Sequence, residues 1–393
     1  MVEWKELGQL GKFENIGTDK KITEGEKLVT LLNYVDVYHH KYIDSSIPQM
    51  QVSASDKKIE SCTVEEGDIF VTPSSETVDD IGHSSVITET ISNAVYSYHI
   101  MRFRLFEKNM LLSYYINYAF DTENVKRQIL KKAQGLTRFG LSKDKFASIS
   151  LPIPSLQEQE RIVSVLDTFT ASIDNLKEQI KERRKQYEHY RDQLLDLEGK
   201  EGVEMNTLGE LGKFVRGSGI QKSDFIEDGK PCIHYGQIHT KYSLSTTKAI
   251  SMIDENLYNR CKKASKGDVI LATTSEDAEG CAKPVAWLGD EDVAISGDAY
   301  IYQHNQNGKF MALQFTTNRF MQFKVRNVTG AKVIRISGDS MAKYEFPLPN
   351  METQSRIVSI LDTFEASITN LEAQLREREK QYEYYRNKLL TFE

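Results

Sequence analysis

Residues 152–198 read PIPSLQEQERIVSVLDTFTASIDNLKEQIKERRKQYEHYRDQLLDLE, and residues 347–393 read PLPNMETQSRIVSILDTFEASITNLEAQLREREKQYEYYRNKLLTFE. About 28 of these 47 aligned positions are identical, which identifies an internal repeat. Apolar residues recur in both copies at alternating steps of four and three, the spacing of a coiled-coil seam. The predicted seam consists of Ile162, Leu166, Phe169, Ile173, Leu176, Ile357, Leu361, Phe364, Ile368 and Leu371.

Each copy of the repeat is predicted to be one long helix. Ser155 and Glu158 form the pattern of a capping box, and Asn350 takes the cap position in the second copy. Neither copy contains an interrupting proline or glycine, so each helix can run for about 40 residues, or about 60 Å. We expect the two apolar stripes to cover each other within one chain. Arg183 and Arg378 fall in the seam, where a polar residue can fix the register.

The segments before the two helices are also related. Val203–Phe214 (VEMNTLGELGKF) restates Val2–Phe13 (VEWKELGQLGKF), and Gly267-Asp268 restates Gly67-Asp68. Thr329-Gly330-Ala331-Lys332 stands where Gln134-Gly135-Leu136-Thr137 stood. In the first segment, β-rich runs are predicted at Lys27–Tyr38, Asp68–Thr72 and Ala94–Arg104, followed by a helical stretch near Asn109–Lys132.

The resulting prediction is an α+β chain with pseudo-twofold order. Two similar, mixed, β-rich globular heads, residues 1–154 and 199–349, are separated by helices at residues 155–198 and 350–393 that form an intramolecular antiparallel coiled coil. The framework of the heads recurs, whereas the loop contents differ widely.

Composition excludes several classes of protein. No apolar run approaches the roughly 20 residues that span a bilayer, and the start lacks the pattern of a secretory signal. The four cysteines show no CxxC spacing, which favours free thiols in a reducing cytoplasm. The net charge of −7 counts mildly against a nucleic-acid partner, although local patches matter more than the sum.

Catalytic and metal-binding patterns are not evident, so no catalytic residue and no metal ligand is predicted. There is no GxxxxGK[ST] loop and no glycine-rich cofactor turn between a strand and a helix. The His39-His40 pair lacks further ligands at metal-binding spacing. Glu76 and Glu276 recur after the Gly-Asp strands, and two interpretations stay open: they tie a loop, or they accept a hydrogen bond from cytosine N4.

Basic residues, aromatic residues and loop amides cluster at corresponding places in the two heads. Lys and Arg neutralise phosphates, while Gln and Arg at loop tips can contact base edges. Any single one of them is more simply explained as a solubility residue, but their recurrence around repeated glycines favours a binding role. The candidate DNA-contacting residues are Lys20, Lys21, Tyr38, His39, Lys41, Ser75, Glu76, Lys132 and Arg138 in the first head, and Arg216, Gln221, Lys222, Tyr235, Gln237, His239, Lys241, Ser275, Glu276, Lys332 and Arg335 in the second.

The whole chain resembles the specificity (S) subunits of type I restriction-modification systems. The resemblance rests on the head-helix-head-helix order, the LGxLGKF openings and the Gly-Asp strands. The most specific motifs are the Pro-x-Pro segments followed by QEQERIV (Gln157–Val163) or TQSRIV (Thr353–Val358), and the repeated Leu-Asp-x-Phe (Leu166–Phe169 and Leu361–Phe364). One departure from the motif is that Thr353 and Ser355 in the second copy replace the glutamates Glu158 and Glu160, so the second cap lacks the glutamate of a capping box.

The resemblance implies a non-catalytic, cytoplasmic DNA-recognition subunit. Each head would contact one half of a split, asymmetric double-stranded DNA target, and the helices would set the gap and dock two modification (methyltransferase) subunits. Those subunits would supply S-adenosylmethionine, and restriction subunits would supply ATP and Mg chemistry. Two alternatives remain at this point: duplicated enzyme domains on a coiled-coil dimeriser, and a scaffold without a DNA role.

Overall fold

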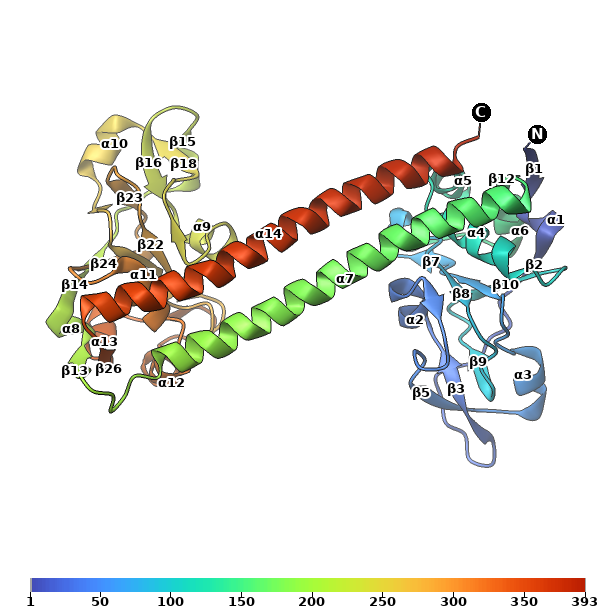
Figure 1. Ribbon diagram of the computed structural model, residues 1–393, viewed down its shortest axis with the longest axis horizontal. Helices are drawn as coiled ribbons and strands as arrows, with labels where there is room; N and C mark the ends of the chain where they lie inside the picture. Colours follow the sequence, from blue (N-terminus) through green and yellow to red (C-terminus); the bar gives the residue numbers. More distant parts are fainter. Residues whose placement is uncertain (1, 393) are drawn as a thin grey trace. The chain divides into compact units, whose positions relative to one another are not determined.

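The computed structural model describes residues 2–392, which form two compact units. The first unit contains the residues up to Glu178 together with those from Ala373 onward, and the second contains Gln179–Glu372. The long helices α7 (Leu156–Leu195) and α14 (Met351–Leu390), both of 40 residues, therefore contribute a part to each unit (Figure 1). Their predicted lengths are confirmed, as is the α+β class with two similar heads.

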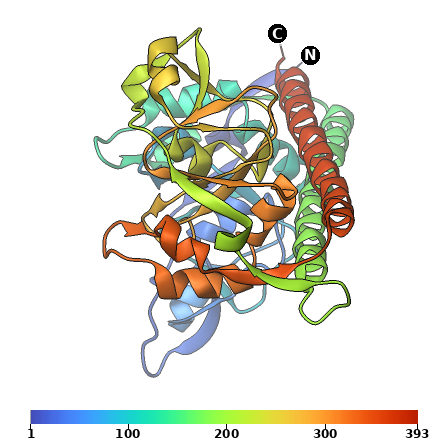
Figure 2. The same cartoon turned by 90° about the vertical axis from the view of Figure 1, so that its left-hand side faces the viewer.

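Within each unit, a part of α7 lies antiparallel against a part of α14. In the second unit, Arg184 pairs with Glu372 at 2.6 Å, while Tyr187, one turn later, contacts Glu365 at 3.3 Å. The ring of Tyr190 packs against Phe364 at 5.2 Å, and the equivalent pair in the first unit, Phe169 and Tyr385, stacks at 5.3 Å. Figure 2 shows the two helices side by side next to the second head.

The apolar seam continues into the core of each head. Ile162 and Leu166 of α7 join the core of the first unit, together with Leu390 from the far end of α14. Ile357 and Leu361 occupy the equivalent place in the second unit, together with Leu195 of α7. Ile173 is also buried, whereas Phe169, Leu176, Phe364, Ile368 and Leu371 are half-buried. Each head therefore packs on the start of one helix and the end of the other.

The first head is built on a five-stranded sheet, with the strand order β2-β10-β6-β8-β4, and a three-stranded sheet, β5-β3-β9. The strands are β1 (Glu3–Glu6), β2 (Gly11–Glu14), β3 (Lys27–Leu32), β4 (Tyr42–Ile43), β5 (Met50–Ala54), β6 (Ile69–Val71), β7 (Ser74–Ser75), β8 (Ser84–Ile87), β9 (Ala94–Tyr96), β10 (Met101–Leu105), β11 (Phe139–Gly140) and β12 (Ser150–Ile153). The helices are α1 (Leu7–Leu10), α2 (Tyr34–His39), α3 (Asp56–Ser61), α4 (Met110–Phe120), α5 (Glu123–Lys132) and α6 (Lys143–Ala147), with a 3-10 turn at Val78–Asp80.

The second head repeats this topology. Its larger sheet has the order β14-β24-β20-β22-β17, and its second sheet, β15-β18-β16-β23-β19, carries two additional short strands. The strands are β13 (Glu204–Thr207), β14 (Gly212–Arg216), β15 (Phe225–Ile226), β16 (Lys230–Ile233), β17 (Ser245–Thr246), β18 (Ser251–Ile253), β19 (Lys263–Ala264), β20 (Val269–Ala272), β21 (Thr274–Ser275), β22 (Lys283–Trp287), β23 (Val293–Ile295), β24 (Ala299–His304), β25 (Ile334–Arg335) and β26 (Glu345–Leu348). The helices are α8 (Leu208–Leu211), α9 (Tyr235–Thr240), α10 (Glu255–Arg260), α11 (Gly308–Gln314), α12 (Asn318–Asn327) and α13 (Gly338–Ala342), with a 3-10 turn at Lys222–Asp224.

Three sequence-based boundaries are wrong, and local hydrogen bonding explains two of them. The run Lys27–Tyr38 is a strand only as far as Leu32, because Asn33 caps helix α2 by accepting a hydrogen bond from the Val35 amide at 2.9 Å. The run Ala94–Arg104 is two strands, separated at residues 97–100. The helical stretch 109–132 is broken after Phe120, where Thr122 caps the second helix.

The caps of the long helices differ from each other. Ser155 accepts a hydrogen bond from the Glu158 amide at 3.4 Å, but the Glu158 carboxylate pairs with Arg161 at 2.6 Å. In the second copy, Asn350 accepts from the Thr353 amide at 2.9 Å. The predicted cap at Asn350 is therefore confirmed, and its shorter hydrogen bond indicates the better-formed contact of the two.

The first two strands of the larger sheet have the same register in both heads but different side chains between them. Phe13 stacks on Phe103 at 4.4 Å, and the equivalent pair, Phe214 and Tyr302, stacks at 4.5 Å. One residue further along, Glu14 faces Arg102 across β2 and β10, whereas Val215 faces Ile301 across β14 and β24. A buried charge pair in the first head therefore corresponds to an apolar pair in the second.

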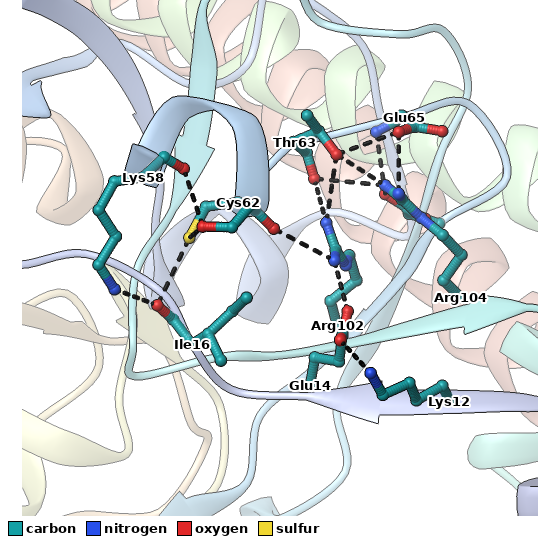
Figure 3. Close-up of polar contacts among 11 residues, drawn as sticks. Lys12, Glu14, Ile16, Lys58, Cys62, Thr63, Glu65, Arg102 and Arg104 are labelled. Carbon is teal, nitrogen blue, oxygen red and sulfur yellow. Dashed lines mark hydrogen bonds and ion pairs between the residues drawn. The ribbon is translucent and has the colours of Figure 1, made fainter. Parts of the chain in front are cut away.

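Figure 3 shows how this charge pair is held. The Arg102 guanidinium, only 5% exposed as a side chain, donates to Glu14 at 2.5 Å and to the Thr63 carbonyl at 2.7 Å. Lys12 pairs with the same glutamate at 2.7 Å. Arg104 binds Asp68, the aspartate of the Gly-Asp motif, at 2.6 Å. The contacts of Arg102 and Arg104 with Thr63 and Asp68 tie strand β10 to the turn that precedes β6, and Glu14 ties β10 to β2.

Candidate nucleic-acid interface

A short hairpin-like loop in each head carries three of the exposed candidate residues, namely Arg138 in the first head and Lys332 and Arg335 in the second. In the first head, residues 134–140 form a closed loop, since the Gln134 and Gly140 backbones exchange two hydrogen bonds of 3.0 and 2.8 Å. Strand β11 at its base pairs with β7, and the Leu141 amide donates to the Pro73 carbonyl at 2.9 Å. Gly135 adopts φ +141°, and a Cβ there would lie 1.9 Å from the Arg138 carbonyl oxygen, so the loop requires glycine.

An aromatic group from helix α2 lies beside this loop. The rings of Tyr34 and Tyr38 stack at 5.8 Å, and Tyr38 packs on His83 at 4.4 Å. The Tyr38 hydroxyl donates to Asp80 at 3.4 Å. Burial raises the pKa of Tyr34, while the Ser75 hydroxyl and the Arg138 charge act in the opposite direction, which places Tyr34 next to the β7 and β11 strands.

Two of the predicted basic residues lie on the same surface. Burial lowers the pKa of His99, and the positive charges of Lys20 and Arg138 lower it further. Arg138 also donates to the Ser74 hydroxyl at 3.3 Å. Side-chain and strand contacts thus bring Tyr38, Ser75 and Arg138 close together, and Lys20 lies near enough to His99 for its charge to act there. Exposed Lys21, His39 and Glu76 lie next to them in the chain.

Two other candidates in the first head have intramolecular partners. The Lys41 ammonium pairs with Asp121, donates to the Asn117 carbonyl at 3.1 Å and lies 4.7 Å from the centre of the Tyr118 ring. The Lys132 ammonium donates to the carbonyl and hydroxyl oxygens of Ser148 at 2.7 and 2.6 Å. A DNA role for Lys41 and Lys132 stays a prediction, and it would require these contacts to be given up.

The second head has the same loop. The Thr329 and Arg335 backbones exchange two hydrogen bonds of 2.8 Å, and Gly330 adopts φ +104°. Strand β25 pairs with β21, as β11 pairs with β7. The loop tip exposes Lys332, and Arg335 lies at its base. Ser275 ends strand β21, and Glu276 follows it on the surface.

Helix α9 of the second head occupies the place of α2. The ring of Tyr235 packs on His234 at 4.6 Å, and burial and the Lys222 charge lower the pKa of His234. The Gln237 side chain is engaged at both ends, since it accepts from the His234 amide at 3.0 Å and donates to Ser251 at 2.6 Å. His239 contacts the Thr274 carbonyl at 3.0 Å.

The remaining candidates of the second head lie at the surface. Arg216 donates to the Gly297 carbonyl at 2.9 Å and lies 3.8 Å from Asp298. Gln221 and Lys241 are exposed, at the start of the 3-10 turn and at the end of α9. The contribution of each to binding stays a prediction.

Sequence reasoning missed three members of the first surface, namely Tyr34, His99 and Leu136. Tyr34 is the equivalent of Tyr235, which was a candidate, so the repeat could have predicted Tyr34 as well. Leu136 stands between Gly135 and Gly140, in a segment that the repeat aligned with residues 329–332. Nothing local marks His99, whose link to this surface is the charge effect of Lys20 and Arg138 across the fold.

No cluster of three or more His, Cys, Asp or Glu side chains that could hold a metal ion occurs among residues 2–392. Within the same residues, no helix is both long and apolar enough to cross a lipid bilayer.

The family model for the type I restriction modification DNA specificity domain matches residues 1–183 and again residues 200–379. The chain belongs to this family. Each head, with the adjoining part of a long helix, is therefore one copy of a DNA specificity domain. The predicted family resemblance is confirmed, and the chain carries the domain twice.

Similar proteins agree with this assignment. The chain is 31% identical to the EcoR124I/EcoR124II specificity subunit of Escherichia coli over 66% of each protein, just under two thirds of either length. It is 28% identical to a putative type I restriction enzyme specificity subunit of Haemophilus influenzae over 66% of this chain and 68% of that protein.

Solved structures show the same fold. The S subunit of a type I restriction-modification system from M. genitalium matches with a TM-score of 0.56 at 13% identity and covers 100% of this chain and 97% of its own. A second structure comes from work on complex assembly and conformational transition of the type I R-M system. It matches with a TM-score of 0.59 at 14% identity, and the match covers 99% of this chain and 96% of the solved chain.

Proposed function

We propose that this chain is the non-catalytic DNA-recognition subunit of a type I restriction-modification complex. Each specificity domain contacts one half of a bipartite target in double-stranded DNA. The two half-sites differ in sequence, so the target is asymmetric. The chain itself carries no cofactor, and its modification and restriction partners bring S-adenosylmethionine, ATP and Mg.

One observation supports this proposal above the others. The loops at residues 134–140 and 329–335 have the same backbone hydrogen bonds and the same left-handed glycine, but they carry different side chains. Arg138 in the first loop corresponds to Val333 in the second, and Thr137 corresponds to Lys332. A constant frame with variable tips is what two related domains need in order to recognise two different base sequences.

The long helices fit the roles of spacer and docking site. A helix of 40 residues is about 60 Å long, which exceeds the 34 Å of one DNA turn. The surface residues of α7 and α14 repeat more closely than a spacer requires, so the two copies offer equivalent surfaces to two identical modification subunits.

The decisive experiment is single-molecule methylome sequencing of cells that express this chain with its modification subunit. We expect one interrupted, asymmetric motif. Replacement of residues 1–154 by another head should change one half-site and leave the other half-site and the gap unchanged. Methylation without an interrupted motif, or a change in both half-sites, would contradict the assignment of one half-site to each head.

The helix role has its own test. Insertion of one heptad into both α7 and α14 should widen the gap and preserve both half-sites. A changed half-site with an unchanged gap would contradict the spacer role. If alanine at Ser75, Glu76, Ser275 and Glu276 abolished methylation without weakening DNA binding by the complex, the duplicated-enzyme alternative would replace our proposal.

A further inference from the structure

Leu136, at the tip of the first loop, is the most exposed large hydrophobic residue in the part of the chain that the structure describes, with 96% of its surface accessible. Single exposed apolar side chains are common, so exposure alone says little. What distinguishes Leu136 is the backbone beneath it. An apolar side chain at the end of a rigid loop cannot fold back onto its own domain.

Several independent contacts hold the loop. The Gln134 and Gly140 backbones bond to each other in both directions, and Gly135 closes the turn in a conformation that a Cβ would block. Arg138 is tied to Ser74 at 3.3 Å, and the loop base pairs with β7. Because the loop is already ordered, the loop itself loses little conformational entropy when a partner contacts Leu136.

The surroundings of the loop identify the kind of partner. Arg138, which donates to Ser74 of β7, and Lys20 supply positive charge, Asp19 and Asp80 supply negative charge, and the stacked Tyr34 and Tyr38 rings lie near Ser75. A protein interface has an apolar core of several residues inside its polar rim, but the loop neighbours of Leu136 at Gln134, Thr137 and Arg138 are polar and extend no such core. In contrast, DNA offers apolar base surfaces between phosphate charges, which matches a single leucine two residues away from the Arg138 cation.

The second head provides a natural comparison. The equivalent of Leu136 is Ala331, and it is followed by Lys332 in place of Thr137. The frame is the same, including Gly330, where a Cβ would lie 2.1 Å from the Val333 carbonyl oxygen. The frame is therefore retained while the apolar tip is not, so the leucine is not needed to build the loop.

We propose that Leu136 is a specificity-determining residue, which makes an apolar contact with one base of the half-site recognised by the first head. The contacted surface is either the C5-methyl group of a thymine or the face of a base at an unstacked step. This inference rests on the proposed DNA-recognition function and adds a residue and a type of contact to it.

The test uses the complex of the full chain with its modification subunit and a duplex that carries the motif found by methylome sequencing. Leu136→Ala should weaken binding to this duplex about tenfold and relax discrimination at one position of the first half-site. Discrimination in the second half-site should not change. Leu136→Met, which keeps the apolar bulk, should restore most of the binding. Leu28→Ala is the matched control, since Leu28 is also exposed and lies on β3 of the same head.

Replacement of thymine by uracil, one position at a time, separates the two kinds of apolar contact. If one such replacement weakens the wild-type complex and not the Leu136→Ala complex, Leu136 contacts that methyl group. If no replacement has this effect but Leu136→Ala still loses affinity, the leucine packs on a base face.

Two results would overturn the inference. One is a Leu136→Ala complex with unchanged affinity and unchanged discrimination. The other is weaker association of Leu136→Ala with the modification subunit in the absence of DNA, which would make the leucine a protein contact. Failure of the proposed function is distinguishable, because the wild-type complex would then show no interrupted target at all.

Discussion

The ion pair between Arg102 and Glu14 allows the second head to serve as a design for the first. Val215 and Ile301 occupy the equivalent positions in the same strand register. The double variant Glu14→Val with Arg102→Ile therefore installs a pair that this fold already accommodates. We predict that the double variant loses much less free energy of unfolding than the sum of the losses in the two single variants.

The magnitudes follow from the contacts. Loss of one partner from a buried ion pair costs about 3–5 kcal/mol, because the other charge is left uncompensated. We expect about 3 kcal/mol for Arg102→Ile, since Glu14 is 19% exposed and keeps Lys12. We expect a similar loss for Glu14→Val, which leaves the guanidinium with neutral partners, namely the Thr63 and Ser61 carbonyls, the Thr63 hydroxyl and the Tyr96 ring.

The free energy of unfolding of the double variant should be lower than that of the wild type by no more than about 3 kcal/mol. Most of this loss arises because the Thr63 carbonyl no longer accepts the 2.7 Å hydrogen bond from Arg102. The coupling energy would then be about 3 kcal/mol. Lys12→Ala is the matched control, because it removes only an exposed partner of Glu14 and should cost less than about 1 kcal/mol.

Hydrogen exchange followed by mass spectrometry is the appropriate assay, since it reports the two heads separately. Amides of β10 should exchange faster in both single variants and recover in the double variant, while those of β24 serve as the internal reference. If the losses in the single variants simply add in the double variant, the reasoning from the second head is refuted.

The same pair has a pH signature. Although burial acts to raise it, the pKa of Glu14 is lowered overall by hydrogen bonds and charges from Lys12 and Arg102. A carboxyl group whose pKa is lower in the folded state stabilises the fold above its unfolded pKa, here 4.5, and loses this contribution as the pH falls through the folded value. Below about pH 4.5, the wild type should therefore lose more β10 protection than the double variant.

Two further predictions concern single side chains. Burial lowers the pKa of His304 to about 4. Because the unfolded chain then binds a proton at a higher pH than the folded chain does, the free energy of unfolding of the second head should fall by about 2 kcal/mol between pH 6.5 and pH 4. His304→Leu, which copies Leu105 of the first head, should abolish this loss in denaturation measured across that pH range, and an unchanged slope would exclude His304 as its source. Asp167 of the Leu-Asp-x-Phe motif accepts hydrogen bonds from Tyr42 and Tyr118, both at 2.5 Å, so Asp167→Asn should cost the first head about 2 kcal/mol in urea denaturation. Asp362→Asn in the second copy, where Lys309 is paired with a partly exposed carboxylate, should cost less than about 1 kcal/mol, and equal losses would contradict this difference.

Features that repeat along the chain could be predicted without coordinates. The length of α7 and α14 follows from an uninterrupted 3.5-residue period, and the equivalence of the two loops follows from their shared glycines and spacing. The break after Leu32 was harder to predict. Residues 27–38 are uniformly rich in strand-forming side chains, and the end of the strand depends on one hydrogen-bonded cap at Asn33.

The tertiary structure decided which candidate side chains are available to a partner. From the sequence, Lys41, Lys132 and Arg138 are equivalent candidates. In the structure, Lys41 pairs with Asp121 and Lys132 donates to Ser148, whereas Arg138 lies at the surface near Tyr34. Local pattern determines where helices, strands and turns form, because those depend on neighbours in the chain. The partner of a charge and the exposure of Leu136 depend on segments that only the folded chain brings together.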